Sequence, residues 1–112
     1  MSTREVVLVS ARDADGSMHR SVALTEAGDL VLTGHDLGPG VERAFGDGLD
    51  EYEFVRTVRA EHVPAVLAAL GAADPEQLLG EIAARFTSRS PDLERFWRDH
   101  HIPSEFWSRV GG

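Results

Sequence analysis

The chain has 112 residues and a formal net charge of −8, from 11 basic and 19 acidic side chains. Its hydrophobic fraction of 42% and charged fraction of 27% are close to globular averages, so we expect one folded domain, 1–112. An acidic surface repels phosphate backbones and anionic lipids, which argues against nucleic-acid and membrane binding. The absence of cysteine excludes disulfides, thiolate metal sites and cysteine nucleophiles within this sequence.

The longest apolar runs, at 6–9 and 63–70, are much shorter than the roughly 20 residues that a membrane span needs. The first residues include Arg4 and Glu5 and pass directly into a strand pattern, without the apolar stretch of a secretory signal. We therefore expect a cytoplasmic protein.

Three strand patterns come first along the chain. Residues 5–11 are β-branched and apolar almost throughout, which is typical of a strand that is covered on both faces or lies centrally in a sheet. Residues 18–25 alternate loosely and 30–37 follow, and the connectors are short enough for hairpins. The sequence therefore predicts a three-stranded meander.

The next stretch, 38–48, is rich in glycine, although Val41 and Phe45 are spaced like one helical turn. We expect an ordered loop with a short helical turn. It leads into a fourth strand at 51–59 and a first helix at about 61–70. In that strand, alternate apolar residues define one face, namely Tyr52, Phe54 and Val58. In the helix, apolar residues recur at helical spacing, namely Val63, Val66, Leu67 and Leu70.

Two cap-plus-proline signals mark the starts of further helices. Asp74-Pro75 opens a second helix, and Ser90-Pro91 opens a third. Residues 104–110 then have a strand pattern. The sequence therefore predicts an α+β fold with an antiparallel sheet of about five strands, four N-terminal and one C-terminal, and three helices packed on one side.

The dipeptide His35-Asp36, between Gly34 and Gly38, is the first candidate for a catalytic site. A histidine beside a carboxylate can act as a general base or a metal ligand. The alternative is a strand end at which Asp36 begins a turn and His35 faces solvent. We favour this alternative, because one dipeptide does not assemble a site.

His100 and His101, at the end of the third helix, are the second candidate, as metal ligands. Neighbouring helical residues point about 100° apart, so the two rings do not easily share one ion. A cationic histidine near a helix C-terminus also has a structural role against the helix dipole. We therefore expect no metal and no cofactor.

Acidic and aromatic residues make the candidate binding surface. A hydrolase that uses two paired carboxylates needs a raised pKa on one of them, and burial would raise it. Nothing in the sequence indicates that these acidic residues are buried. A solvated acidic rim would instead attract a basic protein partner. Trp and Arg are frequent at interface hot spots, and a tryptophan next to an inward-facing strand residue points away from the core. The predicted binding residues are Asp47, Asp50, Glu51, Glu53, Trp107 and Arg109.

The sequence ends with Gly111-Gly112, as ubiquitin-like modifiers and sulfur-carrier proteins do. Only these two residues match, and four strands before any clear helix depart from the β-grasp order. We therefore favour the other interpretations over a carrier.

Three stretches, LTGHDLGPGVERAFGDG, DEYEFVRTVRAEHVPAVLAALG and HHIPSEFWSRV, resemble a group of small, cysteine-poor bacterial proteins that is common in actinobacteria. The likeness covers roughly residues 28–110. No activity is assigned to that group, so the resemblance implies a stand-alone bacterial domain and no catalytic residues.

Together these patterns favour a non-enzymatic protein-binding module of the antitoxin or immunity kind, with a basic partner. The alternatives are a small metal-dependent or His/Asp hydrolase, built on His35 and Asp36 with His62 or His100, and a Gly-Gly carrier. We also expect the final strand to be a sheet edge, through which two copies could form a homodimer.

Overall fold

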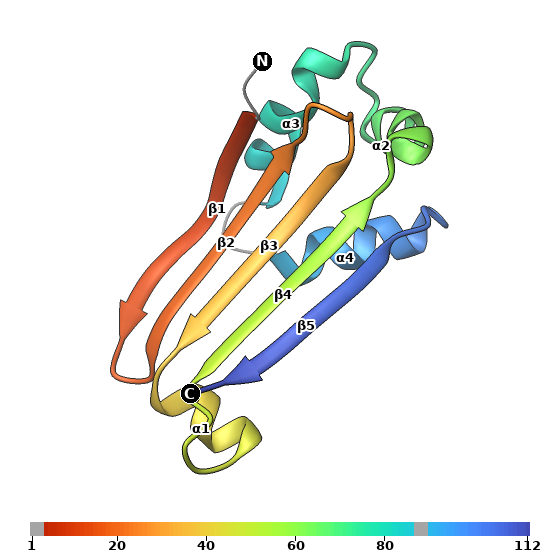
Figure 1. Cartoon of the computed structure of the whole chain (residues 1–112). Coiled ribbons are helices and arrows are strands. Elements are labelled where there is room, and N and C mark those ends of the chain that lie inside the picture. Colours follow the sequence, from red (N-terminus) through yellow and green to blue (C-terminus); the bar gives the residue numbers. More distant parts are fainter. Residues whose placement is uncertain (1–3, 87–89) are drawn as a thin grey trace.

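The computed structural model of the protein describes residues 4–86 and 90–112, without the side chains at 90 and 91. The described residues form a five-stranded antiparallel sheet in the order β1-β2-β3-β4-β5 and four α-helices (Figure 1). The strands are β1 Arg4–Asp13, β2 Gly16–Leu24, β3 Leu30–Leu37, β4 Glu51–Val58 and β5 Glu105–Gly111. The helices are α1 Pro39–Phe45, α2 Val63–Leu70, α3 Leu78–Phe86 and α4 Ser90–Asp99, with 3-10 turns η1 Ala60–His62 and η2 Pro75–Gln77 before α2 and α3.

The expected α+β fold and its five-stranded antiparallel sheet are confirmed. The number of helices differs, because α1 is a separate helix within the stretch that we expected to be a loop with one helical turn. Gly38 (φ 115°) lets the chain turn sharply there, and Pro39, in the first turn of α1, favours a helical φ. The side chains of the expected cap at Ser90-Pro91 lie outside the described part of the structure.

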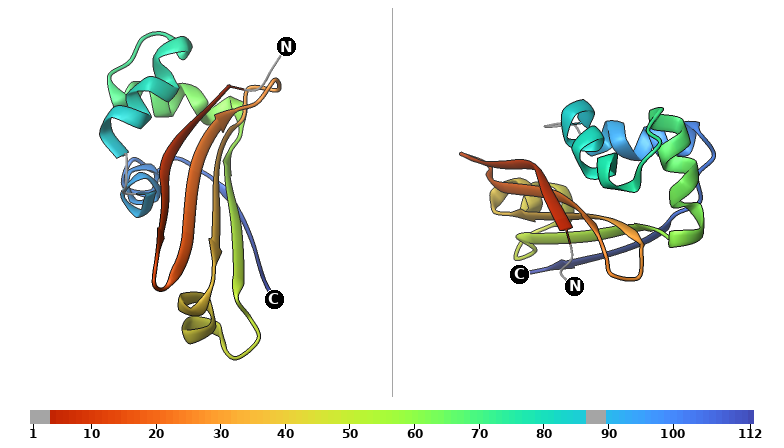
Figure 2. Two further views of the ribbon diagram at one scale, coloured as in Figure 1. Left: turned by 90° about the vertical axis from the view of Figure 1, so that its left-hand side faces the viewer. Right: turned by 90° about the horizontal axis from the view of Figure 1, so that it is seen from above.

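One face of the sheet carries the helices and the hydrophobic core. The two views in Figure 2 show α2, α3 and α4 against this helix-bearing face. Antiparallel register places Val22 beside Leu32, and Leu30 beside Val58, so the inward side chains of three strands form one apolar layer. The most deeply buried side chains in the described part come from the sheet and from α2, α3 and α4, namely Val22, Leu30, Leu32, Val58, Val66, Leu78, Ile82, Leu93 and Trp97.

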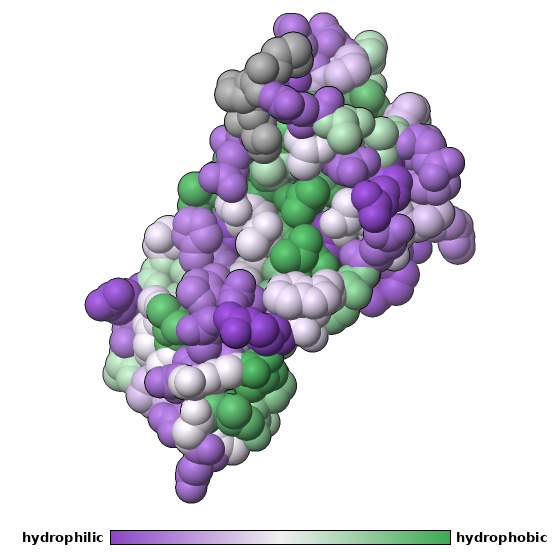
Figure 3. Space-filling view, viewed as in Figure 1, coloured by the Kyte–Doolittle hydropathy of each residue, from purple (hydrophilic) through white to green (hydrophobic). Residues whose placement is uncertain are grey.

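The opposite, open face of the sheet has no helix over it in the described part of the chain. Glu51, Glu53 and Val55 of β4 lie on this face, while Phe54 and Val58 face the helices. The alternation that we predicted for this strand is therefore present. Figure 3 views the open face and shows hydrophobic and hydrophilic groups side by side on it.

The expectation that the first strand lies centrally, or is covered on both faces, is wrong. β1 is an edge strand, and Val7 on the open face is 51% exposed. The register shifts between Val7 and Val9, and the intervening Leu8 is buried to 2% exposure. A bulge of this kind twists an edge strand, which discourages pairing with another chain and explains why a nearly continuous apolar run occurs at an edge.

The final strand lies at the other edge of the sheet, as predicted, and pairs only with β4 among the described strands. Whether two copies form a homodimer through β5 stays a prediction. Within residues 4–86 and 90–112, no helix has the length and apolar character that crossing a membrane requires.

Candidate functional site

The end of the sheet next to α1 is built by backbone hydrogen bonds between distant segments. The Gly38 N–H donates to the Asp50 carbonyl (2.7 Å), and the Gly40 N–H donates to the Asp15 carbonyl (2.9 Å). The Gly48 N–H donates to the Glu42 carboxylate at 3.0 Å. These bonds hold together the β1–β2 turn, α1 and the loop at 46–50, which we call the α1 end.

Glycines allow the β1–β2 turn and α1 to come this close. A Cβ on Gly16 would lie 1.8 Å from the Leu37 carbonyl oxygen, and a Cβ on Gly38 would lie 2.8 Å from the Gly16 Cα. Both glycines also have positive φ values, 122° and 115°. Any other residue at either position would separate the two segments.

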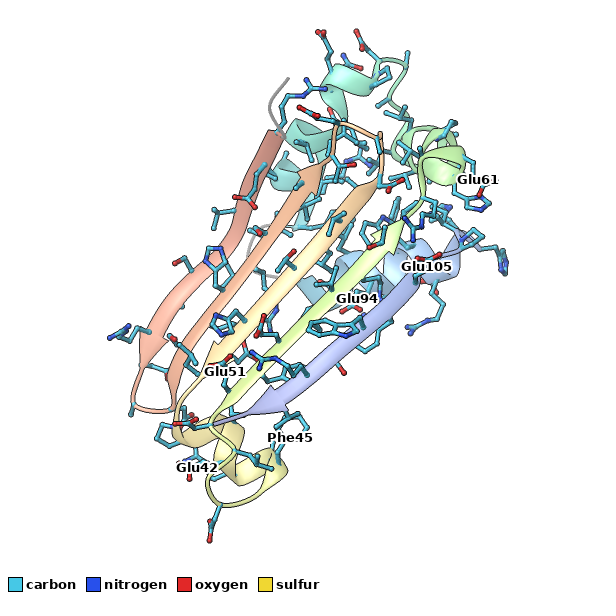
Figure 4. All side chains as sticks on the ribbon, viewed as in Figure 1. Glu42, Phe45, Glu51, Glu61, Glu94 and Glu105 are labelled. Atoms are coloured by element: carbon cyan, nitrogen blue, oxygen red, sulfur yellow. The ribbon has the colours of Figure 1, made fainter. Side chains whose placement is uncertain are left out.

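A hollow of about 280 Å³ lies at the α1 end, on the helix-bearing face. Phe45 of α1 stacks on Tyr52 of β4 with ring centroids 5.2 Å apart, and forms one wall with Val41. Met18 of β2 lines it from the sheet, and Leu37 borders it at the end of β3, where its side chain is on the open face. Figure 4 shows Phe45 on α1, close to the start of β4. The hollow is therefore mainly apolar and aromatic, and it opens to solvent.

Large apolar side chains are unusually exposed at the α1 end. Of the seven large hydrophobic residues with high exposure in the described chain, four lie here, Met18 (43%), Leu37 (39%), Phe45 (47%) and Leu49 (37%). Single exposed apolar residues are ordinary, but a cluster bordered by polar groups is typical of an interaction site.

Carboxylates surround these apolar groups, and they fall into two classes. Asp36 accepts two hydrogen bonds from the Arg20 guanidinium (2.7 and 3.1 Å), and Asp15 pairs with Arg43. These two charges are already compensated. Four further carboxylates at this end have no arginine partner among the described residues, Asp13, Glu42, Asp47 and Asp50.

A second polar cluster lies on the open face of the sheet. The Arg109 guanidinium donates to the Glu51 carboxylate at 2.9 Å and also to that of Glu53. Its hydrogen bond holds the pKa of Glu53 below the ordinary value, and the same bond raises the pKa of Arg109. The Nε2 atom of His35 lies 3.6 Å from Glu51 Oε1.

This cluster has the ligand types of a metal site. One ligand atom from each of His35, Glu51 and Glu53 lies within 4.8 Å of the others, and His35 Nε2 is inaccessible to solvent without a hydrogen-bond partner in the described structure. Imidazole and carboxylate groups together can bind divalent transition metals. However, the Arg109 guanidinium already pairs with both carboxylates and offsets one of their two negative charges, so it would compete with an ion.

The structure places the two residues of the first catalytic candidate on opposite faces of the sheet. Successive residues of a strand face opposite sides, so His35 lies on the open face while Asp36 pairs with Arg20 on the helix-bearing face. His35 and Asp36 therefore do not form one dyad. Its proposed third members lie elsewhere, because His62 is in η1 and His100 follows α4.

The second candidate pair does not assemble a metal site in the described structure. The His100 ring packs against Phe96 with centroids 4.4 Å apart, and His101 has a positive φ of 56° that ends the helix. Neither histidine belongs to the only His/Asp/Glu group of metal-site size found among the described residues.

The predicted binding residues occupy two neighbouring surfaces. Glu51, Glu53 and Arg109 lie together on the open face, and Trp107 is 52% exposed on that face. Asp47 and Asp50 are in the loop of the α1 end. Phe106, the neighbour of Trp107 that the strand pattern predicts to face inward, lies on the helix-bearing face but is 50% exposed and does not fill the core.

Sequence reasoning missed the apolar side of this site. Met18 and Leu37 are in strand patterns, where an apolar residue is expected to be buried, and Tyr52 was assigned to the core face of its strand. One signal was present, because Phe45 is a large apolar residue within the glycine-rich stretch and Leu49 directly follows it.

Comparison of the chain with protein-family models, with curated proteins and with solved structures gave no match.

Proposed function

We propose that this protein is a non-enzymatic, cytoplasmic binding module that holds a basic segment of a protein partner at its α1 end. The observation that carries the proposal is that a hollow with exposed apolar side chains and several uncompensated carboxylates occur together at the α1 end. A partner that buries a basic surface in this way fits the antitoxin or immunity kind of protein.

The two types of group have different roles in such an interface. Phe45 and Met18 offer apolar area, and burying it contributes about 25 cal/mol per Å². The Tyr52 ring stacks on the Phe45 ring and so holds Phe45, the aromatic anchor of the interface, in position. The carboxylates of Asp47 and Asp50 attract a basic partner and speed its association, but they contribute less to the final affinity.

The structure also changes which acidic residues should be tested. Glu51 and Glu53 are already paired with Arg109, so reversing their charge would break that cluster as well as remove a negative surface. Asp47 and Asp50 have no such partner among the described residues. They are therefore the better probes of electrostatic attraction.

The experiment begins with capture of the partner from the source organism's lysate at low and high salt, and then measures its affinity by calorimetry. The test variant is Asp47→Arg/Asp50→Arg. The matched control is Glu61→Arg/Glu76→Arg, which makes the same change in net charge at exposed carboxylates outside the α1 end. A third variant, Phe45→Ala, removes the aromatic anchor.

We expect a basic partner that is lost at high salt. The Asp47/Asp50 variant should slow association at least tenfold, and Phe45→Ala should cost about 2 kcal/mol or more, which is roughly 30-fold in affinity. The control should bind nearly as tightly as the wild type. An acidic partner, or equal losses in the test and control variants, would contradict a site at the α1 end.

A metal-dependent hydrolase is the second candidate function, and the observation that favours it is the cluster of His35, Glu51 and Glu53. If the cluster binds an ion, zinc, manganese or nickel should raise the melting temperature, and Arg109→Ala should increase the effect by removing the competing cation. A ligand at 100 times its dissociation constant stabilises a fold by about 2.7 kcal/mol. An unchanged melting temperature in both proteins would exclude this candidate.

The Gly-Gly carrier needs a mobile tail, but Gly111 belongs to β5 and is paired with Glu51 of β4. The position of the tail therefore does not support this interpretation.

A further inference from the structure

A second hollow, of about 470 Å³, lies between α4 and the sheet and shares no lining residue with the hollow at the α1 end. Its lining includes three arginines, and we call it the arginine pocket. Its lining residues are Arg56, Glu94, Arg95, Arg98, Ile102 and Ser104. Figure 4 shows Glu94 on α4, behind the sheet in that view.

Arg56 of β4 is held in place before any ligand arrives. Its Nε donates to the Glu94 carboxylate at 2.6 Å, and its Nη1 donates to the Ser104 hydroxyl oxygen at 2.9 Å. Its guanidinium lies 4.6 Å from the centroid of the Phe106 ring. Its Nη2 has no hydrogen-bond partner among the described residues. One side of a fixed guanidinium fork is thus available.

The two arginines of α4 differ in their partners. The Arg98 guanidinium has no ion-pair or hydrogen-bond partner in the described part of the chain, whereas Arg95 pairs with Asp92 at 3.5 Å. With Glu94 as the single carboxylate in its lining, the pocket carries three positive charges and one negative charge. When Asp92, the ion-pair partner of Arg95, is included, the local charge is +1, in a chain whose net charge is −8.

We propose that the arginine pocket binds the phosphate group of a small phosphate monoester. A phosphate monoester is close to a dianion at neutral pH, so the excess positive charge of the pocket attracts it, and its oxygens suit the planar guanidinium fork. The Ser104 oxygen accepts from Arg56, so its hydroxyl hydrogen remains free to donate to a phosphate oxygen.

Two effects oppose an anion here, and both are weaker than the attraction. The C-terminus of α4 repels negative charge, but this effect is smaller than that of one hydrogen bond to a charged group. The net negative charge of the protein also repels an anion, although exposed charges beyond a Debye length of about 8 Å are largely screened at physiological salt. Among nearby carboxylates, Glu105 already pairs with Arg59, while Asp99 is exposed.

The test is a titration of the isotope-labelled protein with inorganic phosphate and with phenyl phosphate, followed by NMR, with sodium chloride keeping the ionic strength constant. We expect saturable shifts at Arg56 Nε and at backbone amides of residues 94–104. Tighter binding of phenyl phosphate would identify a monoester as the preferred ligand. Equal or weaker binding of phenyl phosphate, or shifts spread over arginines elsewhere, would overturn the proposal.

Variants make the test specific to this pocket. Arg98→Ala should weaken binding of phenyl phosphate about tenfold or more, because one charge-assisted contact is lost. Glu94→Gln should strengthen it about threefold or more, because a negative charge leaves the pocket while an acceptor for Arg56 remains. Arg12→Ala, which changes the net charge equally at an exposed site on β1, should have no effect. An unchanged affinity in Arg98→Ala, or an equal loss in Arg12→Ala, would overturn the proposal.

Discussion

Replacement of Gly34 by alanine should destabilise the sheet through a single steric contact. Gly34 is paired with Phe54 across β3 and β4, and the Phe54 ring lies over the place that a Cβ would occupy. An added Cβ would lie 2.1, 2.6 and 2.7 Å from three ring carbons, all far below van der Waals contact. Phe54 is 6% exposed and has the Arg20 guanidinium 5.0 Å from its ring centroid, so the ring cannot move away freely.

The expected cost is that of overpacking a core, about 1–3 kcal/mol of the free energy of unfolding. A domain of this size loses about 4–8 °C in melting temperature per kcal/mol, so calorimetry or thermal circular dichroism will resolve the effect. Gly80→Ala is the matched control, because nothing lies within 4 Å of its Cβ position and it is in the helix α3. It should raise stability by roughly 0.5–1 kcal/mol, as alanine does in an exposed helix.

A double-mutant cycle with Phe54→Leu tests the cause of the Gly34→Ala effect. If the ring is responsible, Gly34→Ala should cost clearly less in the Phe54→Leu background, because a smaller side chain leaves room for the new methyl group. An equal cost in both backgrounds, or a Gly34→Ala protein as stable as the wild type, would refute the reasoning.

Three further predictions concern other parts of the chain. Trp97 is 1% exposed, and its indole N–H has no partner in the described structure. In denaturant unfolding, Trp97→Ala should lower the free energy of unfolding by about 3–5 kcal/mol. Trp97→Phe should lower it much less, because the indole N–H makes no hydrogen bond that would be lost. Arg109 lowers the pKa of Glu53, so this pair stabilises the fold at pH values above the ordinary carboxyl pKa. That stabilisation is lost as the pH falls through the lowered pKa. Arg109→Ala should therefore raise the titration midpoint of Glu53 measured by NMR, whereas Arg95→Ala should not. If β5 pairs with a second copy, sedimentation at micromolar concentration should give twice the chain mass of 12.2 kDa, and a monomer at all concentrations would exclude that pairing.

Local patterns predicted most of the fold because each element carries its own signal. The alternation in β4 identified its buried face, and Asp74 caps the next helical segment by accepting from the Glu76 N–H at 2.9 Å. The pattern of β1 misled us, because an apolar run indicates burial and cannot show the bulge that lets Leu8 face the core from an edge strand. The likeness to the actinobacterial group stays a prediction.

The candidate sites were less predictable because tertiary contacts assemble them. The hollow at the α1 end exists because Gly16 meets Gly38, two residues whose separation in sequence hides their contact. The arginine pocket joins Arg56 to residues of α4 that lie about 40 positions later in the chain. The sequence identified the acidic residues and Arg109 as candidates for binding, but it could not show which carboxylates are already paired with an arginine of the same chain.

The two hollows should bind their ligands independently, although a row of rings connects them. Phe45, Tyr52, Phe54 and Phe106 follow one another with centroid distances of 5.2, 6.0 and 6.0 Å on the helix-bearing face. Physical continuity alone does not couple two sites, because coupling needs an element with two arrangements that both ligands bias. Three of these rings belong to one continuous sheet and the fourth, Phe45, to α1, and both hollows are already open without a ligand.

Saturating phenyl phosphate should therefore change the affinity for the basic partner by less than about threefold, a coupling below about 0.7 kcal/mol. Calorimetry of the partner with and without phenyl phosphate measures this coupling, and Arg98→Ala provides the control in which the anion no longer binds. A larger change that disappears in Arg98→Ala would show that the aromatic row adopts two arrangements. In that case the arginine pocket would regulate the binding of the partner.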